Sequence, residues 1–117
     1  MAKARRTPAR HRENKVFLTL LAKFYRGLGD PTRLRILECL KEDERTVSEL
    51  VDLLRSPQGR VSSHLAYLRW CGFVMARQAG HYVSYRLADP RVQQILALGK
   101  ELVTANAAHI FAGTRPR

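Results

Sequence analysis

Residues 57–64 carry a run of side chains that can hydrogen-bond the edges of DNA bases. The stretch reads Pro-Gln-Gly-Arg-Val-Ser-Ser-His. A glutamine such as Gln58 can bridge N6 and N7 of adenine, and an arginine such as Arg60 can bridge O6 and N7 of guanine. Serine hydroxyls reach bases or phosphates, and Gly59 leaves room for a close approach of the backbone. The residues that we expect to contact DNA are Gln58, Arg60, Ser62, Ser63, His64, Tyr67, Arg69, Arg77 and His81.

The distribution of charge indicates that a polyanion binds this part of the chain. The 117 residues include 21 Lys and Arg but only 10 Asp and Glu, a formal net charge of +11. Residues 53–88 contain five arginines and two histidines and no acid, and residues 1–15 contain six basic residues and one acid. Six of the ten acids lie instead in residues 38–52. Because the acids are kept away from residues 53–88, we expect these residues to form the contact surface.

Composition and motifs exclude several other classes of protein. No apolar run approaches the ~18 residues that a membrane-spanning helix needs. Cys39 and Cys71 are too few for a disulfide scaffold, which indicates a reducing cytoplasm. The chain has no metal-ligand cluster and no phosphate-binding glycine loop. Ser62, Ser63 and His64 are neighbours on a helix and point in different directions, so they cannot form a catalytic triad. We therefore do not expect an enzyme.

The elements that must position these side chains follow from periodicity and from capping residues. A basic flexible arm is expected over residues 1–12, a folded domain over 13–112 and a flexible tail over 113–117. Helical spacing of apolar residues predicts a first helix over 13–28, and Asp30-Pro31 is the start signal of a second. Thr46 and Glu49 form a capping box for a short helix to Leu54, and Ser56-Pro57 begins a fourth helix that runs to Cys71. Strand-like runs at 73–78 and 82–87 predict a β-hairpin, and a last helix begins at Asp89-Pro90.

This order predicts a mainly α-helical fold with a small β-hairpin, a winged helix-turn-helix. A short capped helix, a three-residue turn (Arg55, Ser56, Pro57) and a longer helix make the helix-turn-helix, whose second helix enters the major groove of DNA. Val61, Leu65 and Leu68 recur at helical spacing and are expected to face the core. The hairpin behind it is the wing, and its Arg77 is expected to lie over the phosphate backbone or in the minor groove.

Five stretches of the chain resemble the ArsR/SmtB-type family of bacterial winged-helix repressors. They are residues 28–37 (LGDPTRLRIL), 47–50 (VSEL), 61–69 (VSSHLAYLR), 71–74 (CGFV) and 82–87 (YVSYRL). The resemblance implies a homodimer paired through its first and last helices. Each protomer would place one reading helix in a palindromic operator, and an effector would release the DNA. The apolar surplus of the first and last helices agrees with dimerisation.

The resemblance does not identify the signal that would release DNA. The cysteine-rich motif of metal sensors in this family is replaced by residues 46–52 (TVSELVD), and the last helix lacks the ligands of zinc-type sensors. Cadmium/lead sensors of the family place a thiolate where Cys71 stands and another four residues earlier, where this chain has Tyr67. Cys71 is thus a candidate ligand for a thiophilic metal, and Cys39 ranks behind it. A redox signal acting on the two thiols is a further alternative.

Two functions remain open from the residues alone. The first is a sequence-specific transcriptional repressor that binds operator DNA as a dimer. The alternative is an architectural DNA- or RNA-binding protein, which would use the same basic surface without reading bases. Such a protein would have no need for the face formed by Gln58, Arg60, Ser62 and Ser63.

Overall fold

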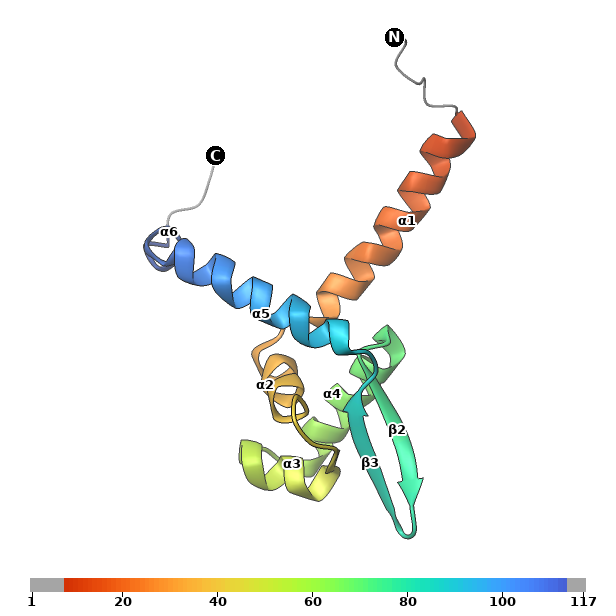
Figure 1. Ribbon diagram of the computed structural model, residues 1–117, viewed down its shortest axis with the longest axis vertical. Helices are drawn as coiled ribbons and strands as arrows, with labels where there is room; N and C mark the ends of the chain where they lie inside the picture. Colours follow the sequence, from red (N-terminus) through yellow and green to blue (C-terminus); the bar gives the residue numbers. More distant parts are fainter. Residues whose placement is uncertain (1–7, 114–117) are drawn as a thin grey trace.

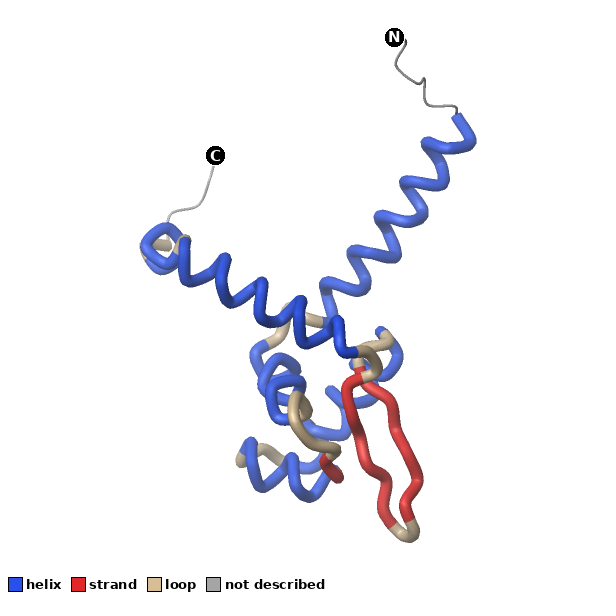
Figure 2. Tube along the Cα trace, viewed as in Figure 1, coloured by secondary structure: helices blue, strands red, loops and turns tan. Residues whose placement is uncertain are grey.

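A computed structural model describes residues 8–113, and it has the element order that the sequence predicts, with a two-residue strand and a short last helix in addition (Figure 1). Two helices, α1 (Pro8–Gly27) and α5 (Pro90–Ala105), extend as separate arms from a central body, and the hairpin points away from them (Figures 1 and 2). The elements of the body are α2 (Pro31–Cys39), β1 (Arg45–Thr46), α3 (Val47–Leu54), α4 (Gln58–Cys71), β2 (Val74–Ala79) and β3 (Tyr82–Leu87). A short α6 (Ala107–Phe111) follows α5.

Capping side chains begin three helices at the predicted residues. Asp30 Oδ2 accepts a hydrogen bond from the backbone N–H of Arg33 at 3.1 Å. Thr46 and Glu49 form the reciprocal capping box, with bonds of 2.9 and 3.2 Å. Asp89 Oδ1 accepts from the N–H of Arg91 at 2.8 Å, and hydrogen bonds from the Arg91 side chain and backbone lower the pKa of Asp89 to about 2. Each cap satisfies an N–H group that a helix start leaves without an acceptor.

The hairpin is part of a three-stranded antiparallel sheet with the order β1-β3-β2. Strand β2 pairs with β3 from Val74 opposite Leu87 to Ala79 opposite Tyr82. Strand β1 was not predicted, because its two residues are too short to show an alternating pattern. It pairs Arg45 with Tyr85, so the chain entering α3 is hydrogen-bonded to the middle of β3. The wing is therefore held to the helix-turn-helix unit.

The core lies between α2, α3, α4 and the sheet. Val61, Leu65 and Leu68 of α4 are fully buried, which confirms their predicted inward direction. Phe73, predicted as the first residue of a strand, is instead a core residue before β2 and packs on Phe24 of α1 with ring centroids 4.4 Å apart. This packing fixes α4 on its inner side, so its outer side is presented to solvent by a rigid body.

Three predicted boundaries differ from the structure. Helix α1 begins at Pro8, so residues 8–12 of the predicted arm have helical backbone; residues 1–7 and 114–117 lie outside the described residues. Pro57, rather than Ser56, is the N-cap of α4 and provides no side-chain hydrogen bond. The last helix is interrupted at Asn106, whose side-chain amide donates to the carbonyl of Leu102 at 2.8 Å. Within the described residues no helix is both long enough and apolar enough to cross a membrane.

Candidate nucleic-acid interface

The turn between α3 and α4 directs the start of α4 outward. Arg55, the residue after α3, has a left-handed backbone conformation with φ 53°, and its N–H donates to the carbonyl of Val51 at 2.8 Å. This conformation reverses the chain within three residues. Helix α4 then lies across α3, with its first turn at the surface of the body (Figure 1). The arrangement is the predicted helix-turn-helix.

The first two turns of α4 present an exposed polar face. Gln58, Arg60, Ser62 and Ser63 are all exposed, and no hydrogen bond joins their side chains to the rest of the described chain. A Cβ atom added to Gly59 would meet nothing within 4 Å. These side chains are therefore free to bond an external partner, and the backbone at Gly59 can approach it closely.

The N-terminus of α4 adds backbone donors to this face. The first N–H with a helical acceptor is that of Val61, which bonds the carbonyl of Pro57 at 3.1 Å. The preceding N–H groups of Gln58, Gly59 and Arg60 have no acceptor inside the helix, and no side chain caps them. Such a helix end is partly positive and suits a phosphate group.

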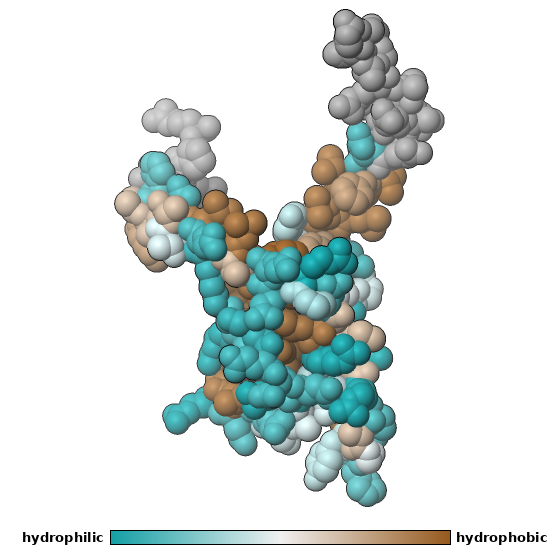
Figure 3. All heavy atoms as spheres, in the orientation of Figure 1, coloured by the Kyte–Doolittle hydropathy of each residue, from teal (hydrophilic) through white to brown (hydrophobic). Residues whose placement is uncertain are grey.

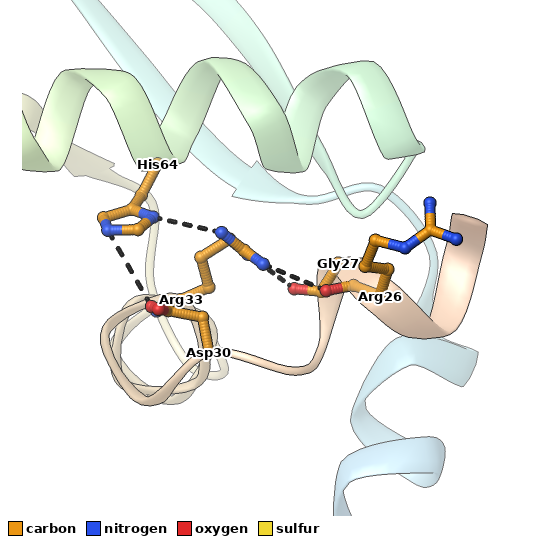
Figure 4. A network of polar contacts seen from close by, with 5 residues as sticks. All are labelled: Arg26, Gly27, Asp30, Arg33 and His64. Carbon is orange, nitrogen blue, oxygen red and sulfur yellow. Dashed lines mark hydrogen bonds and ion pairs between the residues drawn. The ribbon is translucent and has the colours of Figure 1, made fainter. Parts of the chain in front are cut away.

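His64 and Tyr67 follow Arg60 by four and seven residues, so they lie on the same side of α4 as Arg60, where the helix meets α2. His64 is half-buried, with Nδ1 3.4 Å from Nη1 of Arg33 and Nε2 3.8 Å from Oδ2 of Asp30 (Figure 4). The guanidinium of Arg33 lies over the ring of Tyr67, 4.4 Å from its centroid. The structure thus brings these two predicted DNA-contacting residues to the junction between α4 and α2.

The remaining predicted contacts lie at the far end of α4 and on the wing. Arg69 is exposed eleven residues after Gln58, which corresponds to about 16 Å along a helix. Arg77 is exposed on β2 and forms an ion pair with Glu44 at 2.8 Å. His81 is exposed in the hairpin turn. The face at the start of α4, the end of α4 and the wing are therefore three separate groups.

The structure does not assemble a metal site from the two cysteines. Cys71 is half-buried where α4 meets α1, with Sγ 4.0 Å from the carbonyl oxygen of Lys23. Cys39 packs against the core, and burial raises the pKa of its thiol despite the nearby Arg45 and Arg35. Among the described residues, no three His, Cys, Asp or Glu side chains form a group that could hold a metal ion.

A second surface, on the two arms, is apolar rather than polar. Figure 3 shows hydrophobic side chains on both sides of α1, and on α5 beside the space between the arms. An open apolar groove of about 680 Å³ lies where the arms meet the body. Its lining includes Tyr25 and Leu28 of α1, Leu34 of α2, and Ile95, Leu96 and Val103 of α5. We call this surface, together with the exposed Val16, Phe17, Leu18 and Leu20 of α1, the arm surface.

Sequence reasoning missed Arg33 as a residue of this region. It belongs to α2, but its side chain contacts α1 and α4. Spacing along α2 places it beside the buried stripe but says nothing about its partners, which come from other elements. The position of His64 was foreseeable, because a residue three after Val61 and four before Leu68 lies next to the buried stripe.

Comparisons with known proteins agree on one family. The family model described as bacterial regulatory protein, arsR family, matches residues 30–76. A probable mercury resistance operon repressor of Streptomyces lividans is 43% identical over 94 residues, covering 80% of this chain and 75% of the relative. The HTH-type transcriptional repressor SmtB of Mycobacterium tuberculosis is 40% identical over 79 residues, covering 68% of this chain and 58% of the relative.

Solved structures show the same fold. The crystal structure of Rv0081 of M. tuberculosis has a TM-score of 0.75 and 31% identity, and the match covers 81% of this chain and 96% of that one. A homodimeric winged helix-turn-helix DNA-binding domain from Mycobacterium bovis, a possible ArsR-family regulator, has a TM-score of 0.72 and 26% identity. That match covers 89% of this chain and 94% of the other.

Proposed function

The chain belongs to the ArsR family of bacterial regulatory proteins and is a DNA-binding transcriptional regulator rather than an enzyme, and from this premise we propose how it binds its operator. In the proposal it is a repressor that recognises a palindromic operator as a homodimer. One observation carries the assignment of the reading surface. The start of α4 presents polar side chains without partners, in a stretch of 36 residues that contains no acid.

The contacts divide between bases and backbone. Gln58 and Arg60 bond base edges in the major groove, with Ser62 and Ser63 beside them, and the free N–H groups at the start of α4 bond a phosphate. Arg69, Arg77 and His81 lie over the flanking phosphates. Arg77 leaves its ion pair with Glu44 and forms one with a phosphate. His64 and Tyr67, which contact Arg33, act on DNA through the position of α4.

The dimer contact in this proposal is the arm surface. The exposed leucine, valine and phenylalanine side chains of α1 need an apolar partner, and the groove beside α5 offers one. In a symmetric pair, α1 of each protomer covers the arm surface of the other. A two-fold axis between the arms sets the two reading helices about one turn of DNA, roughly 34 Å, apart.

Selection from random duplex DNA tests this function. The full-length protein should enrich a palindromic sequence that it binds at least ~10³-fold more tightly than random duplex. A plot of log affinity against log salt concentration should be linear, with a slope of about −0.9 for each phosphate that the protein neutralises. If RNA or random duplex competes as well as the enriched site, the protein is the architectural type and the repressor assignment is wrong.

Arg77→Ala separates backbone contact from base reading. The variant should bind more weakly on all duplexes, with the salt slope lowered by about one, while the preference for the enriched site is kept. Glu44→Gln is the matched control, because it removes the carboxylate that Arg77 must leave and should strengthen binding. A change in base preference in Arg77→Ala would place Arg77 among the base-reading residues.

We also propose that a thiophilic metal ion acts at Cys71. This thiol lies at the contact between α4 and α1, so a ligand there would shift the reading helix relative to the dimer arm. A closed site needs about four ligands, or three with water, so a second protomer or solvent must complete it. The mercury resistance repressor among the relatives gives mercury(II) as the first ion to test.

Release of DNA by Hg(II), Cd(II), Pb(II), Zn(II), arsenite and peroxide should be measured for the wild type, Cys71→Ser and Cys39→Ser. We expect Hg(II) to release the wild type and Cys39→Ser but not Cys71→Ser. Unchanged release in Cys71→Ser would reject the thiol proposal. Release by peroxide alone, lost in either variant, would establish a redox signal instead.

A further inference from the structure

The side chain of Arg33 joins the C-terminal end of α1 to the reading helix. Its Nε donates to the carbonyl of Gly27 at 2.8 Å, and its Nη2 donates to the carbonyl of Arg26 at 2.9 Å (Figure 4). These carbonyls belong to the last turn of α1, where a helix leaves acceptors unsatisfied and favours a positive charge. The guanidinium therefore caps α1 from a position on α2.

The other side of the same guanidinium faces α4. Nη1 of Arg33 is 3.4 Å from Nδ1 of His64. The guanidinium group of Arg33 also lies over the ring of Tyr67. Trp70, one turn beyond, lies 5.7 Å from Tyr67 between ring centroids, and the Nζ of Lys23 is 3.4 Å from the centre of the Trp70 ring. Two cationic side chains, one from α2 and one from α1, thus lie against two neighbouring aromatic rings of α4, whose planes are tilted by 50°. Contacts of this kind are strongest where water is partly excluded.

Packing next to this network leaves α1 little freedom. Gly27, the last residue of α1, is buried, and a Cβ atom built on it would lie 2.8 Å from the ring of Phe73. It would also lie 3.2 Å from the Sγ of Cys71. The backbone of α1 therefore lies directly against the end of α4, and Arg33 fixes the direction in which it leaves.

We propose that Arg33 and His64 are positioning residues for DNA reading, which hold α4 at a fixed angle to α1. The inference rests on the proposed function, in which α1 contacts the second protomer. Because α1 carries the dimer contact and α4 reads the bases, their relative angle sets the distance between the two reading helices. The network thereby determines the spacing of half-sites that the dimer accepts.

The imidazole of His64 joins Arg33 to Asp30. With its proton on Nε2 it can accept from Arg33 through Nδ1 and donate toward Oδ2 of Asp30, 3.8 Å away. A backbone hydrogen bond from Arg33 lowers the pKa of Asp30, so the carboxylate facing Nε2 stays charged.

The first test compares affinities for two half-sites separated by different spacers. The enriched operator is rebuilt with one base pair added or removed between its halves, and a single half-site serves as reference. The wild type should lose about tenfold in affinity when the spacer changes, whereas Arg33→Lys should lose less than about threefold and bind the single half-site normally. Arg33→Lys keeps the charge but cannot bond both carbonyls in the same geometry.

Arg26→Lys is the matched control for this series. Arg26 joins the network only through its backbone carbonyl, and its side chain points away from the network in Figure 4. It should retain the spacer preference of the wild type. Should Arg33→Lys not fold, His64→Ala takes its place in the series. The same sharp spacer preference in Arg33→Lys or its substitute would overturn the proposal.

The second test needs no DNA. Trp70 is the only tryptophan of the chain, so its fluorescence reports on this junction alone. The emission maximum should shift in Arg33→Lys and in His64→Ala, because Tyr67 and its neighbour Trp70 lose a fixed contact, whereas His81→Gln should keep the wild-type emission. Wild-type emission in both Arg33→Lys and His64→Ala would overturn the role of the network. If no operator is enriched, the proposed function has failed, while this measurement still decides whether the junction depends on Arg33 and His64.

Discussion

The central body and the two arms use their apolar residues in opposite ways. Of the twelve buried hydrophobic residues in the described chain, ten lie between Ile36 and Val74, and Val92 and Leu96 belong to the first turns of α5. None belongs to α1. The arms instead expose large side chains: Val16, Phe17, Leu18, Leu20 and Tyr25 on α1, and Leu98, Leu102, Val103, Ile110 and Phe111 on α5 and α6.

This difference assigns separate tasks to the two regions. The body contains most of the core, to which the arms add Val92 and Leu96 of α5 and the packing of Phe24 of α1. The arms also expose apolar side chains that a small protein rarely leaves in water. In the proposed function, base reading therefore belongs to the body, and pairing of the two bodies belongs to the arms.

The largest effect is expected from a charge on the arm surface. Leu20→Asp should convert the dimer to a monomer, because a carboxylate cannot be buried against the apolar groove. Operator affinity should then fall by about 10²- to 10³-fold, since the second half-site no longer binds with the first. Light scattering and operator binding measure the two effects.

Thr19→Asp is the control for Leu20→Asp. It adds the same charge on the neighbouring residue, on the polar side of α1 that also carries Lys15 and Lys23. This variant should remain dimeric and bind the operator. If Leu20→Asp remains dimeric, the arms do not form the dimer contact, and the proposed difference between the two regions is wrong.

The next largest effect concerns the core of the body. Leu54 is buried and its neighbour Leu53 is half exposed, both at the end of α3. Leu54→Ala should lower the free energy of unfolding by about 2–4 kcal/mol, whereas Leu53→Ala should lower it by less than about 1 kcal/mol. Chemical denaturation followed by circular dichroism gives both values.

Leu54→Ala, combined with Leu20→Asp, also tests whether the body is independent of the arms. The decrease in the free energy of unfolding caused by Leu54→Ala should be equal, within about 0.5 kcal/mol, in the wild type and in the Leu20→Asp background. A cost that depends on the background would show that the body requires the dimer for its stability.

The smallest effect has opposite signs in the two assays. Gly59→Ala should raise the free energy of unfolding by about 0.5–1 kcal/mol, because alanine favours a helix and open space surrounds the site. Operator affinity should nevertheless fall, by about tenfold or less, as the added methyl group separates α4 from the bases. Thermal unfolding of the same preparation serves as the control for folding. Unchanged or improved affinity would mean that this turn of α4 does not approach the DNA closely.

Local signals in the sequence predicted most of the fold. Asp30, Thr46 and Asp89 cap helices as expected, because a cap depends on residues within one turn. Strand β1 was missed because two residues are too short to show a pattern. The interruption at Asn106 was missed because it involves a single side chain, which bonds the carbonyl of Leu102 and has no start or stop signal beside it.

The candidate site was predictable only where it does not involve tertiary contacts. The exposure of Arg60 follows from the buried spacing of Val61, Leu65 and Leu68 on the same helix. Gln58 precedes Val61 by three residues and is exposed because it lies in the first turn. The role of Arg33 does not follow from spacing, because its partners are carbonyls of α1 and rings of α4 that are brought together only by folding. Residues that contact a ligand are thus easier to infer than those that position them.

The central claim is that the start of α4 reads bases, and Arg60→Ala tests it most directly. The affinities of the wild type and the variant should be measured on the enriched operator and on versions with each base pair changed in turn. Arg60→Ala should lose about 1–3 kcal/mol on the operator and lose discrimination at one base pair per half-site, with the other positions unchanged. An equal loss of affinity on every sequence would contradict the account, because Arg60 would then contact only the DNA backbone.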